Sequence, residues 1–286
     1  MNNFNFVTDG SVTYRLGGND WFAVSQDDET VLLVDTDCAL PRSDGTLVGL
    51  ESRWSDGDLE SVDGENGQAL LDYANKLVDK YLGKIKYAMK PINIACDYKE
   101  RIYFSKPKNL KGNIDNAYMF PLSCDEFCNC SDIGSKIYQN SKGNRDNLKN
   151  ENGGNLSDSF VWTRTSSGIN SSGIYRYAWC LDGSGGGLSG NYGNVSYVFR
   201  VAPAFNLKKS LINHITEDGE IILKLEDAGC NNGIAESYSN VIDYVQSIVN
   251  VHDAEIKLHG CSDIPEEKVQ LCRDILQLAN TTVTEK

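Results

Sequence analysis

Apolar and polar residues alternate over the first forty positions in the manner of β-strands. The pattern is carried by TYRLGG (13–18), WFAVS (21–25) and TVLLVDTDCAL (30–40), with turn-forming residues at 17–20 and 26–28 between them. The run from Val31 to Val34 is wholly apolar, which is typical of a central strand. The chain is therefore predicted to begin with a set of strands.

Helical periodicity is clearest between Gln68 and Leu82. Apolar residues recur there at spacings of three and four: Leu70, Leu71, Ala74, Leu77, Val78 and Tyr81. Two later segments, 234–251 and 265–279, show the same periodicity, and Pro265 suits the start of a helix. They follow a predicted hairpin, ITEDGEIILKL (215–225), whose turn is Asp218–Gly219.

The middle of the chain alternates between short elements and polar stretches. The segment NAYMFPLSCDEFCNC (116–130) predicts a short strand and then a short helix capped by Ser123. Residues 139–159 have almost no apolar content and are predicted to form a long exposed loop. The block 160–207 resembles a strand at both ends. We expect an α+β domain over 1–210, and a hairpin with two amphipathic helices over 211–286.

Composition and charge exclude several classes of function. A net charge of −13 over 286 residues argues against a nucleic-acid partner, because phosphate binding needs clustered Lys and Arg. No apolar run approaches the roughly 20 residues of a membrane-spanning helix. The N-terminus lacks a basic region followed by an apolar one, so we expect synthesis in the cytoplasm without a signal peptide.

Nine cysteines without a secretion signal are expected to be mostly reduced thiols. Cys124, Cys128 and Cys130 are close enough in sequence to hold zinc, but a structural site needs a fourth ligand and the histidines are remote. We therefore favour a plain helical turn there, and expect no metal and no cofactor. The acidic loop 55–67 departs from the EF-hand calcium pattern, which favours a solvated loop.

An uncharged stretch near the end of the first domain has an unusual composition. Of the 33 residues from 166 to 198, 22 are Gly, Ser, Tyr or Asn, and only Arg176 and Asp182 are charged. The Lys-Ser/Thr pair of a phosphate loop is missing, and a linker would not carry so many aromatic residues. Antibody-like contact surfaces share this composition. The alternative is a sheet whose tyrosines only pack.

The contact-surface hypothesis selects eight ligand-binding residues within this stretch. If 175–179 is a strand, its alternate aromatic side chains share one face, and the glycine-rich loop after them returns further polar and aromatic groups to that face. The selected residues are Tyr175, Arg176, Tyr177, Trp179, Asn191, Tyr192, Asn194 and Tyr197.

Two short motifs carry a family resemblance: Trp162-x-Arg164-Thr165, and Arg200-x-x-Pro203-Ala204. With YMFPLS (118–123) before them and the Gly/Ser/Tyr-rich stretch between them, they resemble an uncharacterised bacterial and phage domain family of the C-type-lectin-like superfamily, alongside formylglycine-generating enzymes. The resemblance covers about 10–210 and implies a C-type-lectin-like fold with much irregular loop. The stretch also resembles the variable proteins of diversity-generating retroelements, which display a diversified ligand face.

The resemblance separates scaffold from surface. Trp162 and Phe205 are expected to be buried, Pro203 to be structural, and Arg164 and Arg200 to donate hydrogen bonds to backbone carbonyls that frame the loops. Cys180 is the only cysteine of the matching C-terminal block, so the cysteine pair of the formylglycine-generating enzymes is not evident. The histidines, His214, His252 and His259, all lie beyond this block.

These observations favour a non-enzymatic ligand- or receptor-binding protein, encoded by a phage or prophage and diversified by a retroelement. Its expected partner is a protein or glycan receptor on another cell or particle. One alternative is a phage tail or surface structural component, associated with the virion; another is an enzyme like the formylglycine-generating ones. The C-terminal helices offer a route to oligomers.

Overall fold

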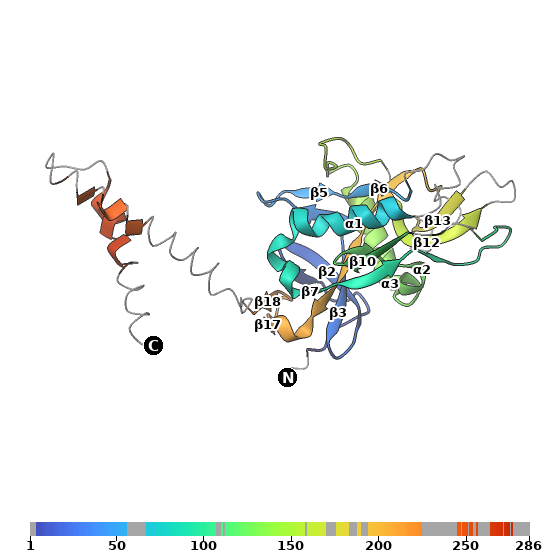
Figure 1. Cartoon of the computed structure of the whole chain (residues 1–286), viewed down its shortest axis with the longest axis horizontal. Helices are drawn as coiled ribbons and strands as arrows, with labels where there is room; N and C mark the ends of the chain where they lie inside the picture. The colour runs from blue at the N-terminus through green and yellow to red at the C-terminus, as the bar shows by residue number, and fades with distance from the viewer. Residues whose placement is uncertain are drawn as a thin grey trace. The chain divides into compact units, whose positions relative to one another are not determined.

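The chain consists of two units, Met1–Lys224 and Leu225–Lys286 (Figure 1). The computed structural model describes residues 4–55, 67–106, 110, 112–157, 159–169, 176–182, 188–189, 194–224, 245–246, 248–250, 252–253, 256, 264–270, 272–274 and 276. The predicted hairpin falls in the first unit, so the boundary lies after Lys224 and not after residue 210.

An antiparallel sheet forms one half of the first unit. Its strand order is β1 (Tyr14–Leu16), β2 (Asn19–Gln26), β3 (Thr30–Asp35), β16 (Pro203–Lys208) and β11 (Phe120–Pro121), with β7 (Met89–Lys90) also pairing with β16. Strand β3 is buried along its whole length, which confirms the central strand predicted from its apolar run. Since every pairing described in this sheet is antiparallel, it is not the sheet of a doubly wound fold.

A second sheet is built around β12 (Val161–Ile169), the longest strand. Its order is β14 (Leu188–Ser189), β13 (Arg176–Leu181), β12, β15 (Val198–Arg200) and β6 (Glu51–Arg53), and β9 (Asp97–Tyr98) also pairs with β12. The β12–β13 pair is antiparallel, whereas β15 and β9 run parallel to β12. Figure 1 shows β12 and β13 side by side at one end of this unit. Strand β13 contains three of the residues selected for ligand binding, Arg176, Tyr177 and Trp179.

The described residues also form three two-stranded sheets and two short 3-10 helices. The pairs are β4 (Ala39–Pro41) with β5 (Leu47–Gly49), β8 (Ile92–Ala95) with β10 (Asn113–Ala117), and β17 (Ile212–Ile215) with β18 (Ile221–Leu223). The last pair is the predicted hairpin, and Gly219 in its turn has a φ of 84°, a conformation that glycine adopts without strain. The 3-10 turns are η2 (Gly83–Ala88) and η3 (Lys209–Leu211).

The helices of the first unit confirm one prediction and correct another. Helix α1 (Gln68–Tyr81) buries the predicted apolar face. Helix α2 (Cys124–Cys128) begins at a capping box formed by Ser123 and Glu126. Helix α3 (Ser131–Asn144) extends into the predicted loop 139–159. Its buried apolar side chains, Ile133, Ile137 and Tyr138, precede that window, and within it the buried Ser141 is polar.

The first unit is thus an α+β fold of many strands and few helices, as predicted. In the second unit, the described residues of 245–256 and 266–276 are helical. The second set lies within the predicted range 265–279, whereas His252, Asp253 and Ile256 lie beyond the predicted end of the first helix at Val251. Their apolar side chains form a small buried cluster of their own: Val245, Val249, Val269 and Cys272.

The scaffold residues identified by the family resemblance lie in the core of the first unit. Trp162 is fully buried and donates from Nε1 to the Ser52 carbonyl at 2.9 Å. Phe205 is also fully buried, with its ring edge-on to Trp21 at 4.8 Å between centroids. Pro203 is buried at the start of β16. The predicted burial of Trp162 and Phe205 is therefore confirmed.

The two scaffold arginines bind backbone carbonyls, as predicted. Arg200 is fully buried and donates to the carbonyls of Leu50 at 3.3 Å and Cys38 at 2.9 Å. Arg164 donates to the Pro121 carbonyl at 2.9 Å and pairs with the Glu126 carboxylate at 2.5 Å. Because a buried guanidinium needs acceptors at fixed positions, these contacts join the strand of each arginine to other segments of the first unit.

Replacing Trp162 with Ala should unfold the first unit at much lower denaturant concentration. Loss of a buried aromatic of this size costs about 3–5 kcal/mol of unfolding free energy. Denaturant unfolding followed by circular dichroism measures the cost. Tyr197→Ala, at a side chain that is 53% exposed, is the control and should change the stability little. An unchanged midpoint for Trp162→Ala would contradict the assignment of Trp162 to the scaffold.

A buried carboxyl makes the stability depend on pH. Asp35 is fully buried and accepts hydrogen bonds from Asn19 Nδ2 at 2.7 Å and from the Ala39 amide at 3.0 Å. Burial raises the pKa of Asp35 from 3.8 to about 8, against the effect of the Asn19 hydrogen bond, and the nearby Asp37 carboxylate also raises it. The folded chain therefore holds a proton that the unfolded chain releases.

The contribution of the Asp35 proton to the unfolding free energy should be fully present below about pH 4. It should fall as the pH rises towards 8. Asp35→Asn removes the titrating group, so the unfolding free energy of the variant should decline less over this range. Urea titrations at several pH values compare the two proteins. Parallel pH profiles for the wild type and the variant would show that Asp35 does not hold the proton.

Candidate functional site

Strand β13 presents two of the predicted ligand-binding aromatic residues on one face. Tyr177 and Trp179 are half-buried, whereas the alternate residues Ala178 and Cys180 point into the core. This is the period of two expected for a strand at the edge of a core. The Trp179 indole donates from Nε1 to the carbonyl of Lys99 at 3.3 Å. This hydrogen bond joins β13 to a part of the chain that the sequence analysis did not select.

That part is the 99–106 segment, which continues from β9 along the end of β12. The Lys99 amide donates to the Ser166 carbonyl at 3.1 Å, and Ser105 and Ile169 exchange two backbone hydrogen bonds of 2.8 and 2.9 Å. Within the segment, the Phe104 amide donates to the Arg101 carbonyl at 3.1 Å and closes a four-residue turn. The segment is therefore fastened to β12 at both of its ends.

Gly168 allows the segment to lie this close to β12. A Cβ atom at Gly168 would lie 2.6 Å from the Ser105 carbonyl oxygen and 3.2 Å from Phe104 Cβ, and the Gly168 φ of 108° also favours glycine. Across this gap, the Phe104 ring meets Tyr177 edge-on at 5.4 Å between centroids. The Arg101 guanidinium covers the Phe104 ring at 4.1 Å.

The tip of the turn places two large apolar side chains in solvent. Ile102 is 76% exposed and Tyr103 is 87% exposed. Tyr103 has a φ of 68°, a left-handed conformation that is uncommon outside glycine. Sequence analysis missed these residues because RIYF (101–104) in a mixed region reads equally well as a buried strand. We call Ile102, Tyr103, Tyr177 and Trp179 the aromatic face.

The surroundings of the tip differ in charge from the rest of the chain. Residues 97–112 contain five basic and two acidic residues, in a chain whose net charge is −13. Lys99, Arg101 and Lys106 are the basic residues in the described part, and Lys106 lies over the Tyr98 ring at 5.8 Å. The described part of 97–112 also contains the acidic residues Asp97 and Glu100, and the Lys99 ammonium is paired with the Asp125 carboxylate at 2.7 Å.

The other predicted ligand-binding residues have different outcomes. Tyr197 is 53% exposed, as predicted, and its ring lies 5.9 Å from that of Phe199 between centroids. Asn194 is only 5% exposed, which corrects the prediction that it lies on the surface. Its side-chain oxygen accepts from the Ser196 amide at 3.1 Å and hydroxyl at 3.0 Å, so it shapes a turn opposite Tyr177. Outside the described residues lie Tyr175, Asn191, Tyr192 and the side chain of Arg176.

The cysteine cluster has a different composition from the one the sequence suggested. The sulfur atoms of Cys124 and Cys128 and a carboxylate oxygen of Asp125 all lie within 4.8 Å of one another. The Cys130 thiol instead donates to the Glu126 carbonyl at 3.0 Å. Burial raises the pKa of Cys124 to about 12, so this thiol is protonated at neutral pH. Of the acidic loop considered for calcium, residues 56–66 lie outside the described part.

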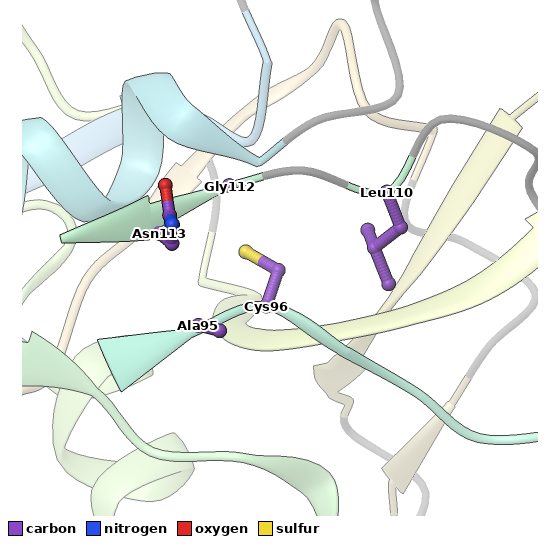
Figure 2. Close-up of a pocket in the computed structure, with 5 residues that line it drawn as sticks. All are labelled: Ala95, Cys96, Leu110, Gly112 and Asn113. Atoms are coloured by element: carbon purple, nitrogen blue, oxygen red, sulfur yellow. The ribbon is translucent and has the colours of Figure 1, made fainter. Parts of the chain in front are cut away.

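An open cavity of about 430 Å³ lies beside the β8–β10 pair. Its lining is Ala95, Cys96, Leu110, Gly112 and Asn113, and Figure 2 shows the Cys96 side chain between those of Asn113 and Leu110. The described lining residues include neither a carboxylate nor a histidine, and burial raises the pKa of the Cys96 thiol. These five residues therefore provide no acid–base pair.

Comparisons with protein-family models, with curated proteins and with solved structures give no match. Among the described residues, no helix combines the length and the apolar character needed to cross a membrane.

Gly168→Ala should loosen the 99–106 segment, because a methyl group there meets the Ser105 carbonyl. Alanine at a positive φ typically lowers the unfolding free energy by more than about 1 kcal/mol. Denaturant unfolding measures the cost, and amide hydrogen exchange should quicken at residues 99–106. Gly83→Ala, where an added Cβ has open space, is the matched control. Equal stability of the two variants would contradict the close packing at Gly168.

Proposed function

We propose that this chain is a non-enzymatic ligand- or receptor-binding protein and that the aromatic face is its binding surface. The observation that carries the proposal is the exposure of Ile102 and Tyr103 on a turn that is fastened to β12. Exposed apolar groups of this size cost solvation free energy unless a partner covers them. A fastened turn also loses little conformational entropy when a partner docks.

The first unit is, on this proposal, a C-type-lectin-like domain with much irregular loop. Support comes from the buried positions of Trp162 and Phe205 and from the carbonyl contacts of Arg164 and Arg200, which suit a scaffold around a variable surface. The Gly, Ser, Tyr and Asn content of 166–198 supports diversification by a retroelement in a phage or prophage. The partner would be a protein or glycan on another cell or particle.

The thiol chemistry of this unit is more consistent with binding than with catalysis. Cys180, the cysteine of the block that resembles the formylglycine-generating enzymes, is fully buried in β13. A reactive thiol usually needs solvent access and a lowered pKa. We therefore favour the binding role over an enzyme of that type.

A phage tail or surface structural component is the second candidate. It is favoured by the separate C-terminal unit, whose helical residues pack around Val245, Val249 and Val269. A short helical module of this kind is suited to joining copies of a chain or attaching it to a particle. The two functions are compatible, since a tail component can carry a receptor-binding face.

The paired change Ile102→Ser with Tyr103→Ser tests the proposal. Both side chains are exposed, so the variant should keep the stability of the wild type. Its affinity should fall by about 2 kcal/mol or more if these residues are the anchors of the interface. Glycan arrays and immobilised host surface proteins supply the candidate partners, and biolayer interferometry measures the affinity.

Leu47→Ser is the control, because Leu47 is an exposed apolar residue in β5. It should retain the partner at full affinity. Full binding by the paired variant would show that the binding surface lies elsewhere. Equal losses in the paired variant and the control would indicate non-specific hydrophobic adhesion.

A further inference from the structure

Three potential metal-ligand atoms converge on the short helix α2. The sulfur atoms of Cys124 and Cys128 and a carboxylate oxygen of Asp125 lie within 4.8 Å of one another. The backbone that carries them is fixed by the Ser123–Glu126 capping box and by a 2.8 Å hydrogen bond from the Cys124 amide to Thr165 Oγ1. The ligand atoms therefore start from a defined arrangement.

A cation already sits at this cluster. The Lys99 ammonium lies 2.7 Å from Asp125 Oδ1 and 3.5 Å from Cys128 Sγ. The Lys99 side chain is 38% exposed and that of Asp125 is 71% exposed, so the ammonium can move into solvent without disturbing the core. Two of the three ligand atoms thus already point towards one positive charge.

We propose that Cys124, Asp125 and Cys128 bind a divalent ion of the zinc class, and that the ion displaces the Lys99 ammonium. Two sulfurs and a carboxylate oxygen are ligands that Zn²⁺ accepts, and water would supply a fourth. Around a tetrahedral zinc, ligand atoms lie about 3.3–3.8 Å apart, so the cluster needs a contraction of roughly 1 Å. Each thiol releases its proton to water as its zinc–sulfur bond forms, and no electrons are transferred.

This site differs from the combination of Cys124, Cys128 and Cys130 that the sequence analysis considered and did not favour. Cys130 donates its thiol proton to the Glu126 carbonyl and takes no part, while Asp125 supplies the third ligand. The site also lies next to the aromatic face, because the Lys99 carbonyl accepts the Trp179 indole hydrogen bond. Binding of the ion would release the Lys99 side chain beside that face. The metal site itself does not depend on the proposed ligand-binding function.

Metal titration of the reduced, metal-free full-length protein tests the proposal. Zn²⁺ affinity and stoichiometry come from competition with a chelating dye, and Cd²⁺ gives a thiolate-to-metal absorption band. Cys128→Ser changes an exposed ligand and should remove one equivalent of bound metal while the far-ultraviolet circular dichroism is unchanged. Asp125→Asn should weaken binding at the same equivalent. Cys130→Ser is the matched control and should leave the affinity unchanged.

Lys99→Gln gives the sharpest result, since it removes the competing ammonium. The affinity of the site should rise by up to about 10-fold, which corresponds to roughly 1.4 kcal/mol. Adventitious binding to other thiols would not respond to this change. The proposal is overturned if Cys128→Ser keeps all of its metal, if Cys130→Ser loses as much as Cys128→Ser, or if Lys99→Gln binds more weakly than the wild type.

Discussion

The structure depends on the burial of strand β12, whose two edges must both pair with other segments. The candidate binding surface is formed by the segments that pair with these edges. The strand is buried along nearly all of its length. Strand β13 pairs with one edge, while β15, β9 and Ser105 pair with the other. Only glycine at position 168 leaves room for the last of these neighbours. Burial of one strand thereby fixes a turn whose tip residues, Ile102 and Tyr103, are exposed.

The scaffold beneath this surface is held by unusual polar contacts. Arg200 and Arg164 are almost completely withdrawn from water, and their guanidinium groups bind carbonyls from other segments of the unit. A buried charge is costly unless hydrogen bonds replace those it made to water, so the loss of any of these contacts should destabilise the first unit.

Local patterns in the sequence predicted the elements whose burial has a simple period. The apolar run of β3, the helical spacing of α1 and the Asp-Gly turn of the hairpin are of this kind, and all are present. Helix α3 was not predicted, because residues 139–144 are polar and its buried apolar residues all precede them. Hydrophobic periodicity can reveal a helix only when the stretch of sequence considered includes the residues of its buried face.

The candidate site was harder to predict, because it depends on contacts between distant segments. Tyr177 and Trp179 could be selected from composition, and both lie on the predicted strand face. Ile102 and Tyr103 could not, since their exposure follows from the packing of Ser105 against Gly168. Asn194 was misjudged for the opposite reason: a polar residue in a glycine-rich stretch is buried when its side chain closes its own turn.

The central claim is that the 99–106 segment and β13 form one binding surface. Amide hydrogen exchange of the full-length chain, measured alone and with a partner identified in the binding screen, tests it most directly. If residues 99–106 and β13 form one binding surface, both segments should gain protection together, while α1 stays unchanged. Protection confined to α1, or to the helical residues of the C-terminal unit, would contradict the account.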